Sequence, residues 1–98
     1  METYYVFYIV AEYGNISKAA KKLFVSQPAV TKSIKNLEEN LGIKLFNRNS
    51  KGVLLTEEGK VLYEYVKNAY IQIEKGEKIV KQLKNKSKGV VRIGISNT

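Results

Sequence analysis

The stretch from Ile16 to Lys35 constrains this chain most, because its pattern is typical of two short helices joined by a tight turn. Ser17 is predicted to cap the first helix. The small residues Ala19 and Ala20 would then face inward together with Leu23. Small side chains on an inner face let a second helix pack closely, so this stretch predicts two helices in contact.

The second helix is predicted to begin after a cap at Ser26, with Pro28 in its first turn, where the missing N–H is not needed. Its core stripe follows helical spacing: Val30, Ile34, Leu37 and Leu41. A polar row lies about 120° around the helix from that stripe, at roughly 100° per residue. Its members are Gln27, Pro28, Thr31, Lys32 and Lys35. A helix that enters the DNA major groove needs such a short, polar and basic face.

Positive charge is concentrated around this helix. The chain carries a formal net charge of +8; residues 16–51 hold eight Lys or Arg against two Glu, a net of +6, whereas residues 1–15 carry −2. Concentrated positive charge favours a polyanion partner, because each neutralised phosphate releases counterions. On charge alone, a solvated basic surface remains an equal alternative.

Composition excludes several classes of protein. Ninety-eight residues with 44% hydrophobic content suit one small domain. With no Cys and no His, we expect no disulfide, no thiol catalysis, no zinc site and no cofactor. The adjacent carboxylates, Glu38-Glu39 and Glu57-Glu58, lie on a helix surface and at a helix start, so we expect no enzyme. No secretory signal is visible and the apolar run 4–11 is too short to span a bilayer, which predicts a cytoplasmic protein without membrane contact.

Residues 2–13 predict a first helix that ends at Gly14 and Asn15. Its expected core stripe is Tyr4, Phe7, Tyr8 and Ala11. After the two central helices, Gly42 is predicted to end the second one in a left-handed conformation.

A hairpin is predicted next. The apolar runs 45–46 and 53–55 flank a polar turn over 47–52. In a winged helix-turn-helix, such a loop lies along the DNA backbone. Its candidate DNA-binding residues are Arg48, Asn49 and Lys51, with Arg48 and Lys51 as phosphate contacts. Taken out of context, the segment is better explained as an ordinary basic hairpin loop.

A long helix is predicted from a cap at Thr56, with Glu57 and Glu58 in its first turn and a mildly unfavourable Gly59. A heptad seam then recurs: Leu62, Val66, Ala69, Ile73, Gly76, Val80 and Leu83. Because so narrow a stripe on so long a helix needs a partner helix, the seam predicts a homodimer interface. The alternative is one long helix that covers its own domain.

The helix is expected to end in a polar linker over 84–89, and residues 90–96 alternate like a strand. A lone strand has no sheet to join, so we expect the chain to be part of a longer protein. The predicted domains are a winged helix-turn-helix over 1–58 with its helix-turn-helix at 16–35, a linker helix over 59–86, and a linker with the first strand of a truncated domain over 87–98.

The chain resembles the N-terminal DNA-binding part of LysR-type transcriptional regulators over nearly its whole length. Five spaced blocks carry the resemblance: Ala19-Ala20-x-x-Leu23, Ser26-Gln27-Pro28-Ala29-Val30, Ile34-x-x-Leu37-Glu38-x-x-Leu41-Gly42, Leu45-Phe46-x-Arg48 and Leu55-Thr56-x-x-Gly59. The resemblance implies a mainly α winged helix-turn-helix with a two-stranded wing, followed by a long linker helix that pairs antiparallel with its twin.

The resemblance also implies a partner and a set of contacts. The partner is double-stranded DNA, bound by a homodimer, with a tetramer as the larger alternative in the full-length protein. A small-molecule effector would bind only the missing C-terminal domain. The DNA-binding candidates on the second helix are Ser26, Gln27, Pro28, Ala29, Thr31, Lys32 and Lys35. Where the family usually has Ser-Arg, this chain has Thr31-Lys32, and an ammonium lacks the planar fork that holds guanine at two atoms. A protein-interaction winged helix with a merely solubilising basic face is the competing hypothesis.

Overall fold

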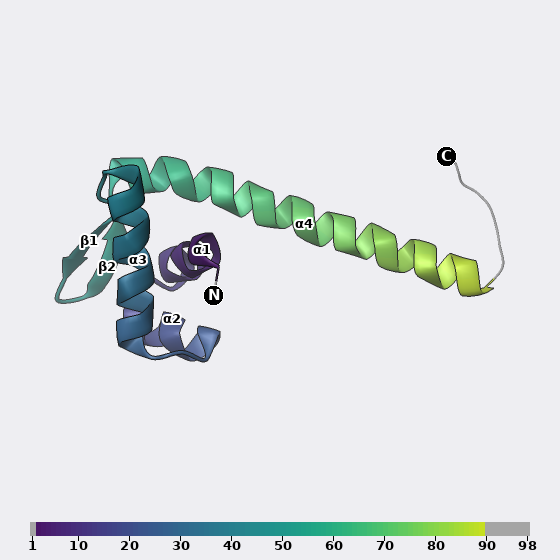
Figure 1. Ribbon diagram of the computed structural model, residues 1–98, viewed down its shortest axis with the longest axis horizontal. Coiled ribbons are helices and arrows are strands. Elements are labelled where there is room, and N and C mark those ends of the chain that lie inside the picture. The colour runs from purple at the N-terminus through teal and green to yellow at the C-terminus, as the bar shows by residue number, and fades with distance from the viewer. Residues whose placement is uncertain (1, 90–98) are drawn as a thin grey trace. The chain divides into compact units, whose positions relative to one another are not determined.

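The computed structural model describes residues 2–89 (Figure 1). The elements in chain order are α1 (Thr3–Tyr13), α2 (Ile16–Leu23), α3 (Gln27–Leu41), β1 (Phe46–Asn49), β2 (Gly52–Leu55) and α4 (Glu57–Gly89). The chain divides into two units, one up to residue 67 and one from residue 68 onward, and α4 belongs to both. The predicted fold class is therefore confirmed: a mainly helical winged helix-turn-helix with a two-stranded wing and a long C-terminal helix.

The core of the first unit lies among its three short helices and the hairpin. Helix α1 contacts α2, α3 and β2, and α2 also contacts α3 (Figure 1). The most deeply buried side chains are no more than 1% exposed: Val6, Phe7, Val10, Ala19, Val30 and Leu45. These residues come from α1, α2, α3 and the entry to β1, so removing any one element would expose the others.

The predicted core stripe of α1 is wrong in phase. Phe7 is fully buried, but Tyr4 is 40% exposed, and Tyr8 and Ala11 are only half-buried. The buried residues of this helix are Val6, Phe7, Ile9 and Val10. Because α1 is apolar around most of its circumference, its aliphatic side can turn inward while the tyrosines keep their hydroxyls near water.

The helix ends are set by local hydrogen bonds, and one predicted cap is wrong. Asn15, not Ser17, caps α2: its Oδ1 accepts the Lys18 N–H at 2.8 Å. Ser26 caps α3 as predicted, since its Oγ accepts the Ala29 N–H at 3.2 Å. The inward stripe of α3 is confirmed at three positions, but Leu41 is 46% exposed because the helix ends there.

The backbone of Leu45 joins α3, the start of β1 and the start of α4. Its N–H donates to the Glu38 carboxylate of α3 at 2.7 Å, and Phe46 N–H donates to the same oxygen at 3.2 Å. Its carbonyl accepts the Thr56 N–H at 2.9 Å, just before α4. The Thr56 hydroxyl donates to the Lys44 carbonyl at 2.8 Å and accepts the Gly59 N–H at 2.9 Å, which makes Thr56 the predicted cap of α4. We call this network the Leu45 junction.

The hairpin is longer in its strands than the sequence predicted. Strands β1 and β2 pair antiparallel, with Phe46 opposite Leu55 and Arg48 opposite Val53. Residues 47–49 therefore lie in a strand, and the turn consists of residues 50 and 51 alone. The Asn49 side chain accepts the Lys51 N–H at 2.8 Å, a local bond that closes the turn.

Helix α4 begins at Glu57 and is tied to α1 at its start. Tyr63 stacks on Tyr8 with ring centroids 5.9 Å apart, and its hydroxyl donates to the Glu12 carboxylate. The helix continues to Gly89, so residues 84–89 are helical and not the predicted linker. This run contains no proline, and Lys84 and Lys86 suit the negative end of the helix dipole. The predicted strand over 90–96 falls outside the described residues.

Gly59 packs so closely that a side chain there cannot be accommodated. An added Cβ would lie 2.2 Å from the Leu45 carbonyl oxygen. We expect Gly59→Ala to lower the free energy of unfolding by about 1–3 kcal/mol, because the Leu45 junction would have to shift. Urea unfolding followed by circular dichroism measures this change.

Gly76 in the same helix is the matched control, because a Cβ there meets nothing within 4 Å. Gly76→Ala should raise the free energy of unfolding by about 0.5–1 kcal/mol. The protein should be dilute enough to remain monomeric, since Gly76 lies on the predicted seam. Equal effects of the two replacements would contradict the close packing at Gly59.

Candidate nucleic-acid interface

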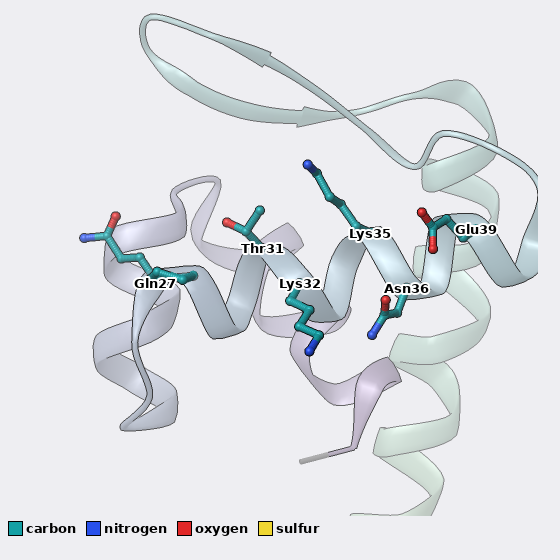
Figure 2. A pocket seen from close by; sticks show the side chains of 7 residues that line it. Gln27, Thr31, Lys32, Lys35, Asn36 and Glu39 are labelled. Atoms are coloured by element: carbon teal, nitrogen blue, oxygen red, sulfur yellow. The ribbon is translucent and has the colours of Figure 1, made fainter.

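The outer face of α3 forms a shallow concave surface. Its lining residues are Gln27, Pro28, Thr31, Lys32, Lys35, Asn36 and Glu39 (Figure 2). Thr31 is half-buried and the others are exposed, whereas the opposite face of the helix buries Val30, Ile34 and Leu37. The packing of α3 therefore leaves the predicted polar row on the solvent side, with Thr31 half-buried.

The polar side chains of α3 form two rows with different surroundings. Thr31 and Lys35 point toward the hairpin, whereas Lys32 and Asn36 point to the other side of the helix in Figure 2. Sequence analysis missed Asn36, although it lies one helical turn beyond Lys32 and extends the same row. It also missed Glu39, which places a carboxylate at the C-terminal end of the surface.

The start of α3 is fixed by its cap, and this determines what the predicted residues there can do. The Ser26 Oγ accepts the Ala29 N–H, so this hydroxyl retains its proton for a further contact. Ala29 is exposed but carries no polar side-chain atom. It can therefore take part only through close van der Waals approach.

The wing brings one of its predicted residues onto α3. Side chains alternate along a strand, so Arg48 shares a face with the buried Phe46, two residues earlier. The guanidinium Nη2 of Arg48 donates to the Thr31 Oγ1 at 3.3 Å. Lys51 is exposed in the turn, and Asn49 uses its side-chain oxygen to close that turn. Of the predicted DNA-binding residues, Arg48 of the wing and Thr31 of α3 are thus brought together by the fold.

The turn between α2 and α3 carries an unusual aromatic residue that sequence analysis also missed. Phe24 is 94% exposed and has a left-handed backbone, with φ of 59°. Its N–H donates to Lys21 O and the next N–H donates to Ala20 O, the pattern that ends a helix at a glycine. Helix α3 ends in the same pattern at Gly42. Phe24 therefore carries backbone strain, and its exposed ring gains no packing energy that would offset this strain.

Two further findings bound the chemistry of this surface. The described residues contain no group of three or more His, Cys, Asp or Glu side chains that could hold a metal ion. Within the same part of the chain, no helix combines the length and apolar character needed to cross a membrane.

Comparison with known proteins identifies this arrangement. Residues 1–60 match the family model described as bacterial regulatory helix-turn-helix protein, lysR family. The chain belongs to the LysR family. The arrangement of α2, α3 and wing described above is thus that of a LysR-family helix-turn-helix domain, which is a domain of regulators and not of enzymes.

Individual LysR-family relatives are similar in sequence to this chain over almost its whole length. The RuBisCO operon transcriptional regulator of Allochromatium vinosum is 36% identical over 93 residues, which cover 95% of this chain and 31% of that protein. The HTH-type transcriptional regulator SoxR of an Arthrobacter strain is 41% identical, with 95% and 32% covered. This chain thus spans about three-tenths of the length of the curated relatives that it matches.

A solved structure is similar in fold as well as in sequence. It is a crystal structure of BenM_DBD in complex with catB site 1 DNA, with a TM-score of 0.77 and 35% identity. The match covers 85% of this chain and 96% of that one. Coverage of 85% means that the similarity extends well into α4.

The strain at Phe24 predicts a stabilising replacement. Phe24→Asn should raise the free energy of unfolding by about 0.5–1 kcal/mol, because Asn tolerates the left-handed conformation that disfavours Phe. The melting temperature should rise by about 4 °C. Phe24→Ala is the control, since it removes the ring and keeps the Cβ that causes the strain. If Ala stabilised the chain as much as Asn, the gain would come from losing the exposed ring.

Proposed function

We propose that this chain is the sequence-specific DNA-binding module of a LysR-type transcriptional regulator. It binds double-stranded DNA as a homodimer, with α3 in the major groove and the wing on the backbone. The observation that carries this proposal is the outer face of α3, which is exposed, polar and basic while the inner face is buried. The similar BenM_DBD structure, which contains DNA, supports it.

The contacts assigned to α3 follow from the chemistry of its side chains. Gln27 stands at the start of the helix and can hold adenine at two atoms. Thr31 and Lys32 lie one turn further along and can reach neighbouring bases. Lys35 and the wing residue Lys51 are assigned to phosphates, since an ammonium is a compact charge with no fixed fork. A DNA partner is consistent with the cytoplasmic location predicted from the sequence.

Replacing Lys32 distinguishes a contact to a base from a contact to a DNA phosphate. Lys32→Ala should weaken binding to the preferred duplex by about 1–3 kcal/mol more than binding to a scrambled one, if the ammonium contacts a base. The preferred duplex is obtained by selecting random DNA with the purified chain. Fluorescence anisotropy titrations on both duplexes measure the difference.

Lys51→Ala is the matched control, because it removes the same charge from the wing turn. It should weaken both duplexes alike and reduce the slope of log K against log salt by about one unit. Equal weakening of both duplexes by Lys32→Ala would make Lys32 a phosphate contact. Absent or salt-insensitive binding of the unmodified chain at low ionic strength would overturn the function itself and favour a protein-interaction domain.

The homodimer is proposed through the seam of α4. Ile73, Val80 and Leu83 are 53%, 65% and 56% exposed, so the seam leaves apolar surface in water. Ala69 and Gly76, also exposed, are small enough to let a second helix approach closely. Val66 is only 6% exposed in the single chain, and Leu62 is half-buried. These two therefore contribute to their own unit, and the partner helix would cover the seam from Ala69 onward.

Ile73→Glu tests the dimer. Sedimentation of the unmodified chain at tens of micromolar should show a dimer, and this replacement should disperse it, because a buried unpaired carboxylate is costly. Lys78→Gln changes the net charge equally from a position off the seam and should leave the dimer intact. A monomeric unmodified chain, or equal dispersal by both replacements, would count against the seam.

A further inference from the structure

Arg48 is predicted from the sequence as a phosphate contact in a polar turn, but its position in the fold differs. It lies in β1, opposite the buried Val53, on the strand face that also carries Phe46. From there its guanidinium reaches 17 residues back along the chain to the Thr31 hydroxyl. The wing therefore places the Arg48 guanidinium beside Thr31, in the row of α3 that faces the hairpin.

This hydrogen bond determines the direction of the Thr31 hydroxyl. A guanidinium has only donors, whereas a threonine hydroxyl has one donor and two acceptor sites. Thr31 must accept from Arg48, so its own proton points elsewhere. Among the described residues, Thr31 makes no second hydrogen bond that would engage this proton. Thr31 thus keeps a donor that can be directed toward the groove.

We propose that Arg48 is a specificity-determining positioning residue: by holding Thr31 as its acceptor, it makes Thr31 a hydrogen-bond donor toward the bases. This inference rests on the proposed function. In the major groove, guanine, adenine and thymine each present an acceptor, whereas cytosine presents only its amino donor. Thr31 therefore discriminates against cytosine at the base that it faces. The other N–H groups of Arg48 remain available for a phosphate.

A double-mutant cycle tests this coupling. Four proteins are compared: the unmodified chain, Thr31→Val, Arg48→Ala and the double variant. Thr31→Val keeps the side-chain shape and removes the hydroxyl. Each protein is titrated with four duplexes that differ only at the base pair where Thr31→Val changes the preference. Thermal melts confirm that each variant is folded.

The unmodified chain should disfavour cytosine at that position by about three- to tenfold, which corresponds to one hydrogen bond. Thr31→Val and Arg48→Ala should each remove this discrimination, and the double variant should show no further loss of it. Arg48→Ala should also weaken all four duplexes, through its phosphate contact. Lys51→Ala, which removes the same charge from the wing turn, should weaken all four duplexes and keep the discrimination.

Other outcomes would overturn the inference. If Arg48→Ala weakened the four duplexes equally and left the preference unchanged, Arg48 would be a phosphate contact alone. A preference for cytosine in the unmodified chain would show that Thr31 acts as an acceptor. If the unmodified chain bound no duplex in a salt-dependent manner, the proposed function would fail first, and this result is distinct from a loss of preference in the variants.

Discussion

The backbone hydrogen bonds of Leu45 are the interaction on which the arrangement of α3, the wing and the start of α4 depends. Leu45 is 1% exposed, so neither its N–H nor its carbonyl can rely on water. Glu38 accepts the first and the Thr56 N–H donates to the second. Because these partners belong to α3 and to the residue just before α4, the backbone of Leu45 fixes α3, the wing and the start of α4 relative to one another. Gly59 completes the junction by leaving room for the Leu45 carbonyl.

The Leu45 junction suits the proposed function, in which α3 and the wing contact the same DNA. The polar row of α3 and the wing come from different parts of the chain, and each would bind weakly if it moved independently. The Glu38 carboxylate joins the last turns of α3 to the first residues of β1, and the wing residue Arg48 then meets Thr31 near the other end of α3. The geometry of the reading surface is therefore set at its rim, by residues that need not touch DNA.

Local chemistry made much of this structure predictable. The cap at Ser26, the proline in the first turn of α3, the end at Gly42 and the cap at Thr56 are all signals within a few residues, and the structure bears them out. The predicted cap at Ser17 failed locally, because Asn15 caps α2, but other failures occurred where the answer depends on distant residues. Helix α1 has apolar residues on most sides, so only its packing decides that Val6 and Val10 turn inward. Gly59 resembles a weak helix residue until the Leu45 carbonyl is placed beside it. The strain at Phe24 requires a backbone angle that composition does not reveal.

The same argument explains why the role of Arg48 was beyond sequence analysis. In a strand, a shift of one residue turns every side chain to the other face. The buried Phe46 fixes the phase of β1, so Arg48, two residues later, lies on the strand face that reaches Thr31, while Asn47 and the 64% exposed Leu54 face outward. A shift of one residue between Phe46 and this strand would turn Arg48 to the outer face. In the proposed recognition, the buried Phe46 would thus act through the phase of the strand, without contact with a base.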